Sequence, residues 1–117
     1  MADLSEAEFD AAAERGRIML LTTPRAQTAR YDAQADRIVV ELVNGCTFSF
    51  PPRLVQGLEA ASAADIAEVD TGPFGIGLHW EKRDVDVTVA GLLAGRFGTA
   101  RYMTERFGPA WNAAAAE

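Results

Sequence analysis

The stretch that decides the fold is Arg37-Ile38-Val39-Val40-Glu41-Leu42-Val43-Asn44-Gly45-Cys46-Thr47-Phe48-Ser49-Phe50. Apolar and polar side chains alternate on both sides of Asn44-Gly45, which indicates two strands joined by a tight turn. A two-residue loop would move Glu41 onto the phenylalanine face. A three-residue loop with a left-handed Gly45 keeps the large apolar side chains on one face. We therefore predict the three-residue loop and the pairs Leu42–Cys46, Val40–Phe48 and Ile38–Phe50.

The rest of the chain supplies shorter elements around this hairpin. A strand at 26–31 precedes it, and Pro51-Pro52 ends it because proline cannot donate to a strand ladder. We then expect a short helix at 53–58, strands at 66–70 and 76–80, and a helix at 87–94 that Asp84 or Asp86 caps and Gly95 stops. The fold class is α+β: a small antiparallel sheet of about four to five strands with short covering helices, plus N- and C-terminal helices.

The two ends of the chain are expected to be helical. Ser5 and Glu8 form a Ser-x-x-Glu capping box, and Leu4 and Phe9 occupy the positions of a hydrophobic staple. This first helix should run from residue 6 to about residue 17. The tail, 99–116, carries its aromatic residues along one side, which we expect to dock on the domain itself; docking on a second subunit is the alternative. The predicted organisation is an N-terminal helix and linker (1–24), an α+β domain (25–95) and a helical tail (96–117).

Charge narrows the classes of partner. The chain of 117 residues carries a net charge of −6, and binders of nucleic acid draw most of their affinity from neutralising phosphates, so direct contact with nucleic acid is disfavoured. Within 59–86 the acidic residues outnumber Lys82 and Arg83; they are Glu59, Asp65, Glu68, Asp70, Glu81, Asp84 and Asp86. This acid is either a solvated face that aids solubility or a surface for a basic partner protein.

Location is inferred from the cysteine content and the start of the chain. Cys46 is alone, so no intramolecular disulfide can form, which fits a reducing cytosol. The first residues are acidic where a signal peptide is basic, and no apolar run is long enough to cross a membrane. We expect a cytoplasmic protein with no membrane segment. The hairpin register puts Cys46 on the apolar face, which predicts an inert thiol.

Residues 72–86 concentrate the rare side chains, including the single histidine. His79 could act as a general base oriented by Asp84 or Asp86, with the hydroxyl of Thr71 or Thr88 nearby. The same side chains could offer at most three metal ligands. We favour structural roles for all of them: glycines in a turn, aspartates as helix caps, and Trp80 as a core anchor that leaves His79 on the opposite side of its strand. No catalytic, cofactor-binding or metal-ligating residue is predicted.

One motif carries a family resemblance. Gly77-Leu78-His79-Trp80, followed by Asp84, Asp86 and the Leu-rich segment 87–93, resembles the DUF2442 domain, a small bacterial domain of unknown function. The resemblance covers roughly 26–95, and Glu81 and Arg83 stand where the family tends to have a proline and an aliphatic residue. It implies a small α+β domain with an antiparallel sheet. Some members are joined to helix-turn-helix domains, and some resemble partners in toxin–antitoxin-like gene pairs.

Three functional hypotheses follow. The first is a non-enzymatic interaction or regulatory module that works through protein–protein contacts and inhibits or sequesters a partner, as an antitoxin does; the terminal helices also offer a surface for a homodimer. The second is a small hydrolase or metal-dependent enzyme centred on His79, Asp84 and Asp86. The third is a DNA-binding regulator. For the first, the candidate interaction surface is Glu68, Asp70, His79, Glu81, Asp84, Tyr102 and Phe107.

Overall fold

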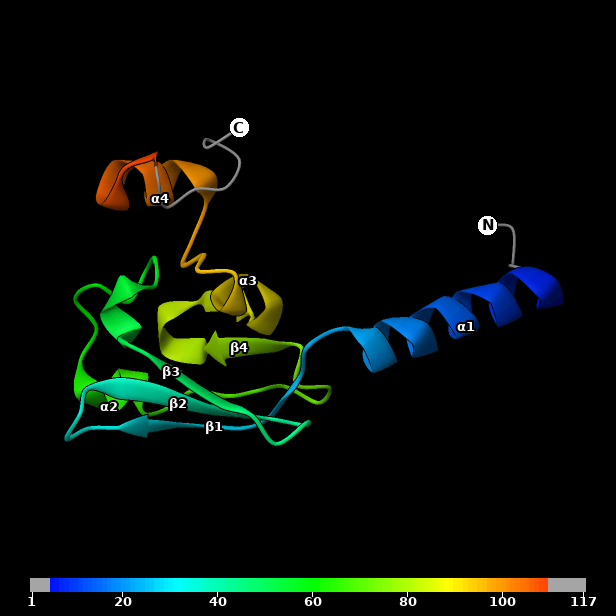
Figure 1. Cartoon of the computed structure of the whole chain (residues 1–117), viewed down its shortest axis with the longest axis horizontal. Coiled ribbons are helices and arrows are strands. Elements are labelled where there is room, and N and C mark those ends of the chain that lie inside the picture. The colour runs from blue at the N-terminus through cyan, green and yellow to red at the C-terminus, as the bar shows by residue number, and fades with distance from the viewer. Residues whose placement is uncertain (1–4, 110–117) are drawn as a thin grey trace.

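The computed structural model describes residues 5–109. Its elements are α1 (Glu6–Thr22), β1 (Ala26–Asp32), β2 (Arg37–Leu42), β3 (Thr47–Phe50), the 3-10 turn η1 (Pro52–Leu54), α2 (Ala63–Ile66), β4 (Gly77–Trp80), the 3-10 turn η2 (Glu81–Arg83), β5 (Val85–Thr88), α3 (Val89–Leu93) and α4 (Ala100–Phe107). The α+β class is confirmed (Figure 1). The strands divide over two antiparallel sheets, β1-β2-β3 and β4-β5.

The predicted hairpin register is confirmed. Ile38 pairs with Phe50 and Val40 with Phe48, and the N–H of Leu42 donates to the carbonyl of Cys46 over 2.8 Å. Gly45 has a φ of 92°, the left-handed conformation that the three-residue loop requires. Period-two alternation therefore fixed the register correctly.

The predicted burial of Cys46 is wrong. Its side chain is exposed, and its N–H donates to the Oδ1 of Asn44 over 2.9 Å within the turn. Strand β3 begins one residue later, at Thr47. Cys46 therefore belongs to the exposed end of the hairpin, and the inertness that we inferred from burial loses its basis.

The core gathers side chains from both sheets. Ile38 and Val40 of β2 pack in one cluster with Leu78 and Trp80 of β4. Trp80 is fully buried, and its indole N–H donates to the carbonyl of Ile66 over 3.1 Å. Its predicted role as a core anchor is confirmed.

The segment between the sheets differs from the prediction. Residues 66–70 do not form a strand, because Ser62 caps α2 by accepting the N–H of Asp65 over 3.2 Å and Ile66 falls inside that helix. Only Asp70 pairs, through an isolated bridge to His79. The helix expected at 53–58 is likewise only the 3-10 turn η1.

The capping role predicted for the two aspartates is also wrong. Residues Val85–Thr88 form β5, which pairs with β4, because β-branched Val85 and Val87 alternate with polar residues. Thr88 caps α3 instead: its hydroxyl oxygen accepts the N–H of Gly91 over 2.9 Å. Asp84 ends η2 with a left-handed φ of 50°. Gly95, with a φ of 79°, follows the end of α3 as predicted.

Helix α4 docks on its own domain, as expected for the tail. Met103 is buried, and Tyr102 and Phe107 pack against the core half-buried. The hydroxyl of Tyr102 donates to the carbonyl of Leu54 over 2.5 Å. The predicted helical region, 99–116, is interrupted at Gly108-Pro109, and Gly108 indeed caps α4. Residues 110–117 lie outside the described part of the chain.

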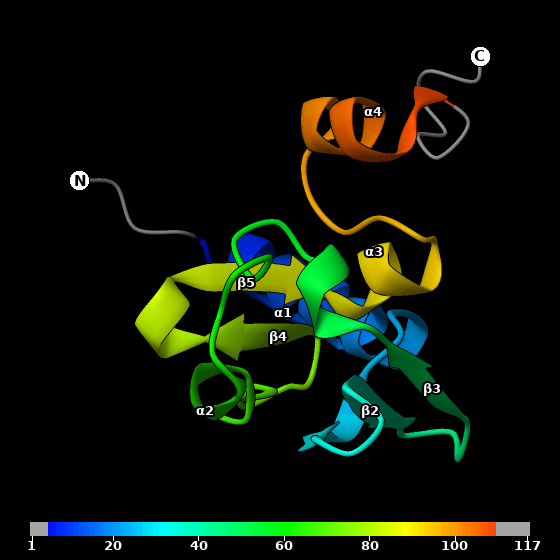
Figure 2. The same cartoon turned by 90° about the vertical axis from the view of Figure 1, so that its left-hand side faces the viewer.

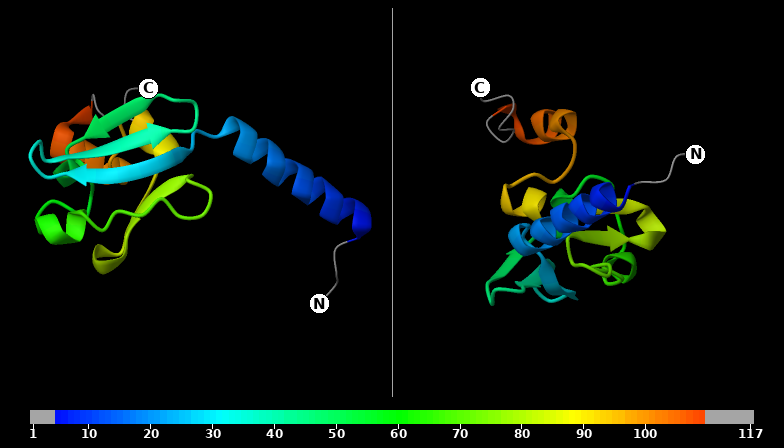
Figure 3. Two further views of the ribbon diagram at one scale, coloured as in Figure 1. Left: turned by 90° about the horizontal axis from the view of Figure 1, so that it is seen from below. Right: turned by 90° about the vertical axis from the view of Figure 1, so that its right-hand side faces the viewer.

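Helix α1 projects away from the domain (Figures 1 and 3). The capping box of Ser5 and Glu8 is confirmed, whereas Leu4 of the expected staple lies outside the described residues. The helix continues to Thr22, beyond the predicted end, and stops because Thr23 precedes Pro24 and is extended. None of its residues is buried. No helix within residues 5–109 is long and apolar enough to cross a membrane.

Two glycines of one loop provide a matched test of the packing between the sheets. Gly72 and Gly75 both have positive φ, but a Cβ on Gly72 meets open space and a Cβ on Gly75 overlaps the carbonyl oxygen of Ala26. The backbone at Gly75 cannot withdraw easily, since its own carbonyl accepts the N–H of Ala26 over 2.7 Å.

We predict that Gly75→Ala lowers the free energy of unfolding more than Gly72→Ala does. Strain alone should cost Gly72→Ala about 1–2 kcal/mol, and overpacking should add about 1–3 kcal/mol for Gly75→Ala. Urea unfolding followed by circular dichroism measures both values. Equal losses would contradict the tight contact at Ala26.

Candidate functional site

The exposed side of the β4–β5 pair carries a row of three charged side chains. Asp70 pairs with His79 through the isolated bridge, and His79 pairs with Asp86 across β4 and β5. Residues directly opposite each other in antiparallel strands point to the same face. Because Leu78 and Trp80 point into the core, alternation turns His79 toward solvent, as predicted.

His79 lies between two carboxylates. Its Nδ1 is 2.7 Å from Oδ1 of Asp86, and its Nε2 is 2.5 Å from Oε2 of Glu81. The hydrogen bond to Glu81 raises the pKa of His79 above its usual value, the bond to Asp86 raises it further, and partial burial of the ring opposes both. The arrangement therefore favours an imidazolium that donates from both nitrogens.

In this geometry both ring nitrogens of His79 are paired with carboxylates. A general base needs a free ring nitrogen toward its substrate, and both nitrogens are occupied here. Of the expected hydroxyls, that of Thr88 caps α3 and that of Thr71 donates to the Gly72 carbonyl over 3.3 Å. Among residues 5–109, no group of three or more His, Cys, Asp or Glu side chains is placed to hold a metal ion.

Five of the seven predicted surface residues belong to this row or lie near it in the sequence. Glu68 pairs with Lys82 over 3.3 Å, and Oδ1 of Asp70 accepts the N–H of Gly72 over 3.2 Å. Asp84 precedes β5 and forms no hydrogen bond with His79. We call this surface the acidic face; its residues are Glu68, Asp70, His79, Glu81, Asp84 and Asp86.

The other two predicted residues, Tyr102 and Phe107, lie on α4, apart from this face (Figure 2). Both are half-buried against the core. The guanidinium carbon of Arg106 lies 5.7 Å from the ring centroid of Tyr102 and 5.2 Å from that of Phe107. These rings therefore contribute mainly to intramolecular packing.

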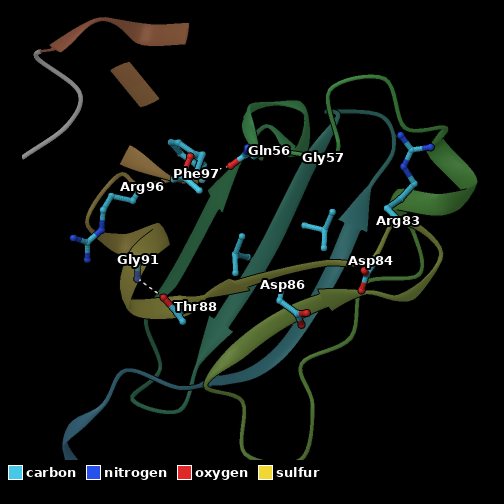
Figure 4. Close-up of a pocket in the computed structure, with 13 residues that line it drawn as sticks. Gln56, Gly57, Arg83, Asp84, Asp86, Thr88, Gly91, Arg96 and Phe97 are labelled. Atoms are coloured by element: carbon cyan, nitrogen blue, oxygen red, sulfur yellow. Dashed lines mark hydrogen bonds between the residues drawn. The ribbon is translucent and has the colours of Figure 1, made fainter. Parts of the chain in front are cut away.

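Two hollows flank the acidic face, and Asp86 lines both. The larger, about 570 Å³, lies along β5 between Arg83 and Arg96 (Figure 4). The smaller, about 210 Å³, is formed by the loop from Thr71 to Gly77 together with Leu78, His79 and Asp86. Its wall includes Phe74, whose side chain is 58% exposed. A large aromatic ring thus stands in solvent in the same hollow as His79 and Asp86.

Phe74 was absent from the predicted surface, although the sequence contained a signal for it. It lies between Pro73 and Gly75, and a turn of this composition runs over the surface, where an aromatic ring has little to pack against. Asp86 was misassigned because a cap and a strand residue cannot be told apart until the pairing with His79 is known.

The fold and this face define a small α+β domain with an open, charged surface in place of an enclosed cleft. The model of the family described as "Protein of unknown function (DUF2442)" matches residues 26–98. The chain belongs to this family.

Two solved structures share the fold. A protein of unknown function from Rhodospirillum rubrum is 54% identical, with a TM-score of 0.67; the match covers 70% of this chain and 99% of that one. An uncharacterized protein from Chromobacterium violaceum, solved by solution NMR, is 28% identical, with a TM-score of 0.69; the match covers 91% of this chain and 97% of that one. No curated protein matches the chain.

We predict that His79 titrates above about 6.5, the ordinary value for histidine. Glu81→Gln and Asp86→Asn should each lower the midpoint, since each removes a hydrogen bond that raises the pKa, whereas Glu41→Gln on β2 should leave it unchanged. The chain has one histidine, so its ring resonance in an NMR titration is unambiguous.

The same shift predicts a pH dependence of stability. A raised pKa in the folded state stabilises the fold below about pH 6.5, and this contribution is lost as the pH rises through the folded pKa. The advantage of the wild type over His79→Gln in urea unfolding should therefore shrink over that window. A difference that grows with pH would contradict the charged bridge.

Proposed function

We propose that the chain is a non-enzymatic module that binds a basic partner protein through the acidic face. The observation that carries this function is Phe74, which stands exposed in the same hollow as His79 and Asp86. Protein interfaces are enriched in aromatic anchors at their centre and surround them with polar groups. Phe74 supplies the anchor, and the carboxylates supply the charged rim.

The charge of the face favours a basic partner. The acidic face carries five carboxylates, of which two, those of Glu81 and Asp86, contact His79, and Lys82 is paired with another, Glu68. Complementary charge speeds association and excludes partners of the wrong sign more than it adds affinity. The net charge of −6 disfavours the alternative of a DNA-binding regulator.

The occupied nitrogens of His79 support a non-enzymatic role over the alternative of a hydrolase or metal enzyme. The proposed module inhibits or sequesters its partner, as an antitoxin does; the likeness of some family members to toxin–antitoxin-like pairs supports this part. We also propose a cytoplasmic location, which the lone Cys46 supports.

We predict that the tagged chain captures a basic protein from a lysate of its source organism and that this partner, once purified, binds the chain directly. Phe74→Ser and Glu81→Lys should each weaken this binding at least about 10-fold. Matched controls are Val43→Ser, at a similarly exposed apolar residue, and Glu41→Lys on β2. Isothermal titration calorimetry measures the affinities, and a comparison of two salt concentrations gives the electrostatic contribution to the binding free energy.

Equal loss from the control variants, or binding unaffected by Phe74→Ser and Glu81→Lys, would rule out the acidic face as the binding surface. Steeply salt-dependent binding to DNA would favour a DNA-binding regulator. A hydrolytic activity abolished by His79→Ala would favour the enzyme.

A further inference from the structure

We propose that α1 is a dimerisation helix that packs antiparallel against α1 of a second copy of this chain. The domain leaves α1 without a partner: none of its residues is buried, and Phe9 and Met19 are 62% and 50% exposed. Most helical stability in proteins comes from the packing of one helix face, and α1, with 17 residues, packs no face against the domain. Since α4 is docked on its own domain, α1 is the terminal helix that remains for association.

One side of α1 carries no charge. At 3.6 residues per turn, six residues fall on one continuous strip that no charged side chain interrupts. We call this strip the neutral stripe; its members are Phe9, Ala12, Ala13, Gly16, Met19 and Leu20. The other exposed apolar residues, Ile18 and Leu21, lie on the far side of the helix, where Glu14 falls between them.

The neutral stripe is complementary to itself in shape. It is large at both ends, with Phe9 at one and Met19 and Leu20 at the other, and small in the middle, at Ala13 and Gly16. In an antiparallel pair, Phe9 of each copy lies opposite Met19 and Leu20 of the other. The small residues then meet at the two-fold axis, where they let the helix backbones approach closely.

Charge selects both a second copy and the antiparallel direction. The first turns of α1 carry Glu6, Glu8 and Asp10, whereas Arg15 and Arg17 lie in the second half. A parallel pair would align acid with acid and base with base. An antiparallel pair places the acidic half of each copy beside the basic half of the other.

One ion pair follows from this direction. Asp10 and Arg17 lie on the same flank of the neutral stripe. In the antiparallel pair, Asp10 of one copy lies beside Arg17 of the other copy. Asp10 makes no ion pair within residues 5–109, and Arg17 is held by Glu14 of its own helix. The symmetric interface thus contains the Asp10–Arg17 contact twice.

Sedimentation equilibrium of the full chain, from about 1 to about 500 µM, tests the dimer, for which we expect a dissociation constant in the micromolar range. Phe9→Glu and Met19→Glu should each weaken dimerisation at least about 30-fold. Val43→Glu places the same charge at an equally exposed apolar residue of the hairpin turn and should have no effect. A monomer at every concentration would overturn the dimer, and an equal loss from Val43→Glu would overturn its location on α1.

A charge swap tests the direction. Asp10→Arg and Arg17→Asp should each weaken the dimer, because each creates two like-charged contacts, and the double variant should recover at least about 10-fold over either. Circular dichroism of every variant checks that α1 stays helical. A parallel pair predicts no recovery in the double variant, so an unrecovered double variant overturns the antiparallel arrangement.

Discussion

The burial of Trp80 is the constraint on which the rest of the domain depends. Its indole is fully buried and donates to the carbonyl of Ile66, which ties β4 to α2. Because neighbouring strand residues face opposite ways, this one anchor sends His79 to solvent, and Glu81 follows in η2. The pairing of β4 with β5 then brings Asp86 to the same side. A core contact therefore determines which charges the surface presents.

The surface that results has much of its charge paired within the chain. His79 and Lys82 each sit against carboxylates, so part of the acid is neutralised within the chain, and what remains is spread around the exposed ring of Phe74. Such a face can recognise a complementary protein surface without enclosing a small molecule. The neutral stripe of α1 is a separate surface, so the proposed association there would leave the acidic face exposed.

The sequence predicted what alternation and turn chemistry determine. The hairpin register followed from keeping Glu41 off the phenylalanine face, and the start of α1 followed from the capping box at Ser5. The failures occurred where short segments satisfy two patterns. Thr88 and Asp86 are both good caps, and only the pairing with β4 decides between them. Likewise the helix cap at Ser62 overrode the alternation at 66–70. The ion pairs of His79 could not be predicted from the sequence, because they depend on the pairing of β4 with β5, which no local pattern reveals.

The isolation of α1 also divides the chain into two cooperative units. The domain is held by one core, whereas α1 contributes no buried residue to it and joins it through the extended Thr23-Pro24 link. The backbone amides of α1 are therefore free to open locally without unfolding the domain. Hydrogen exchange along α1 would then report the helix–coil equilibrium of that segment alone, while the strands exchange with the whole domain.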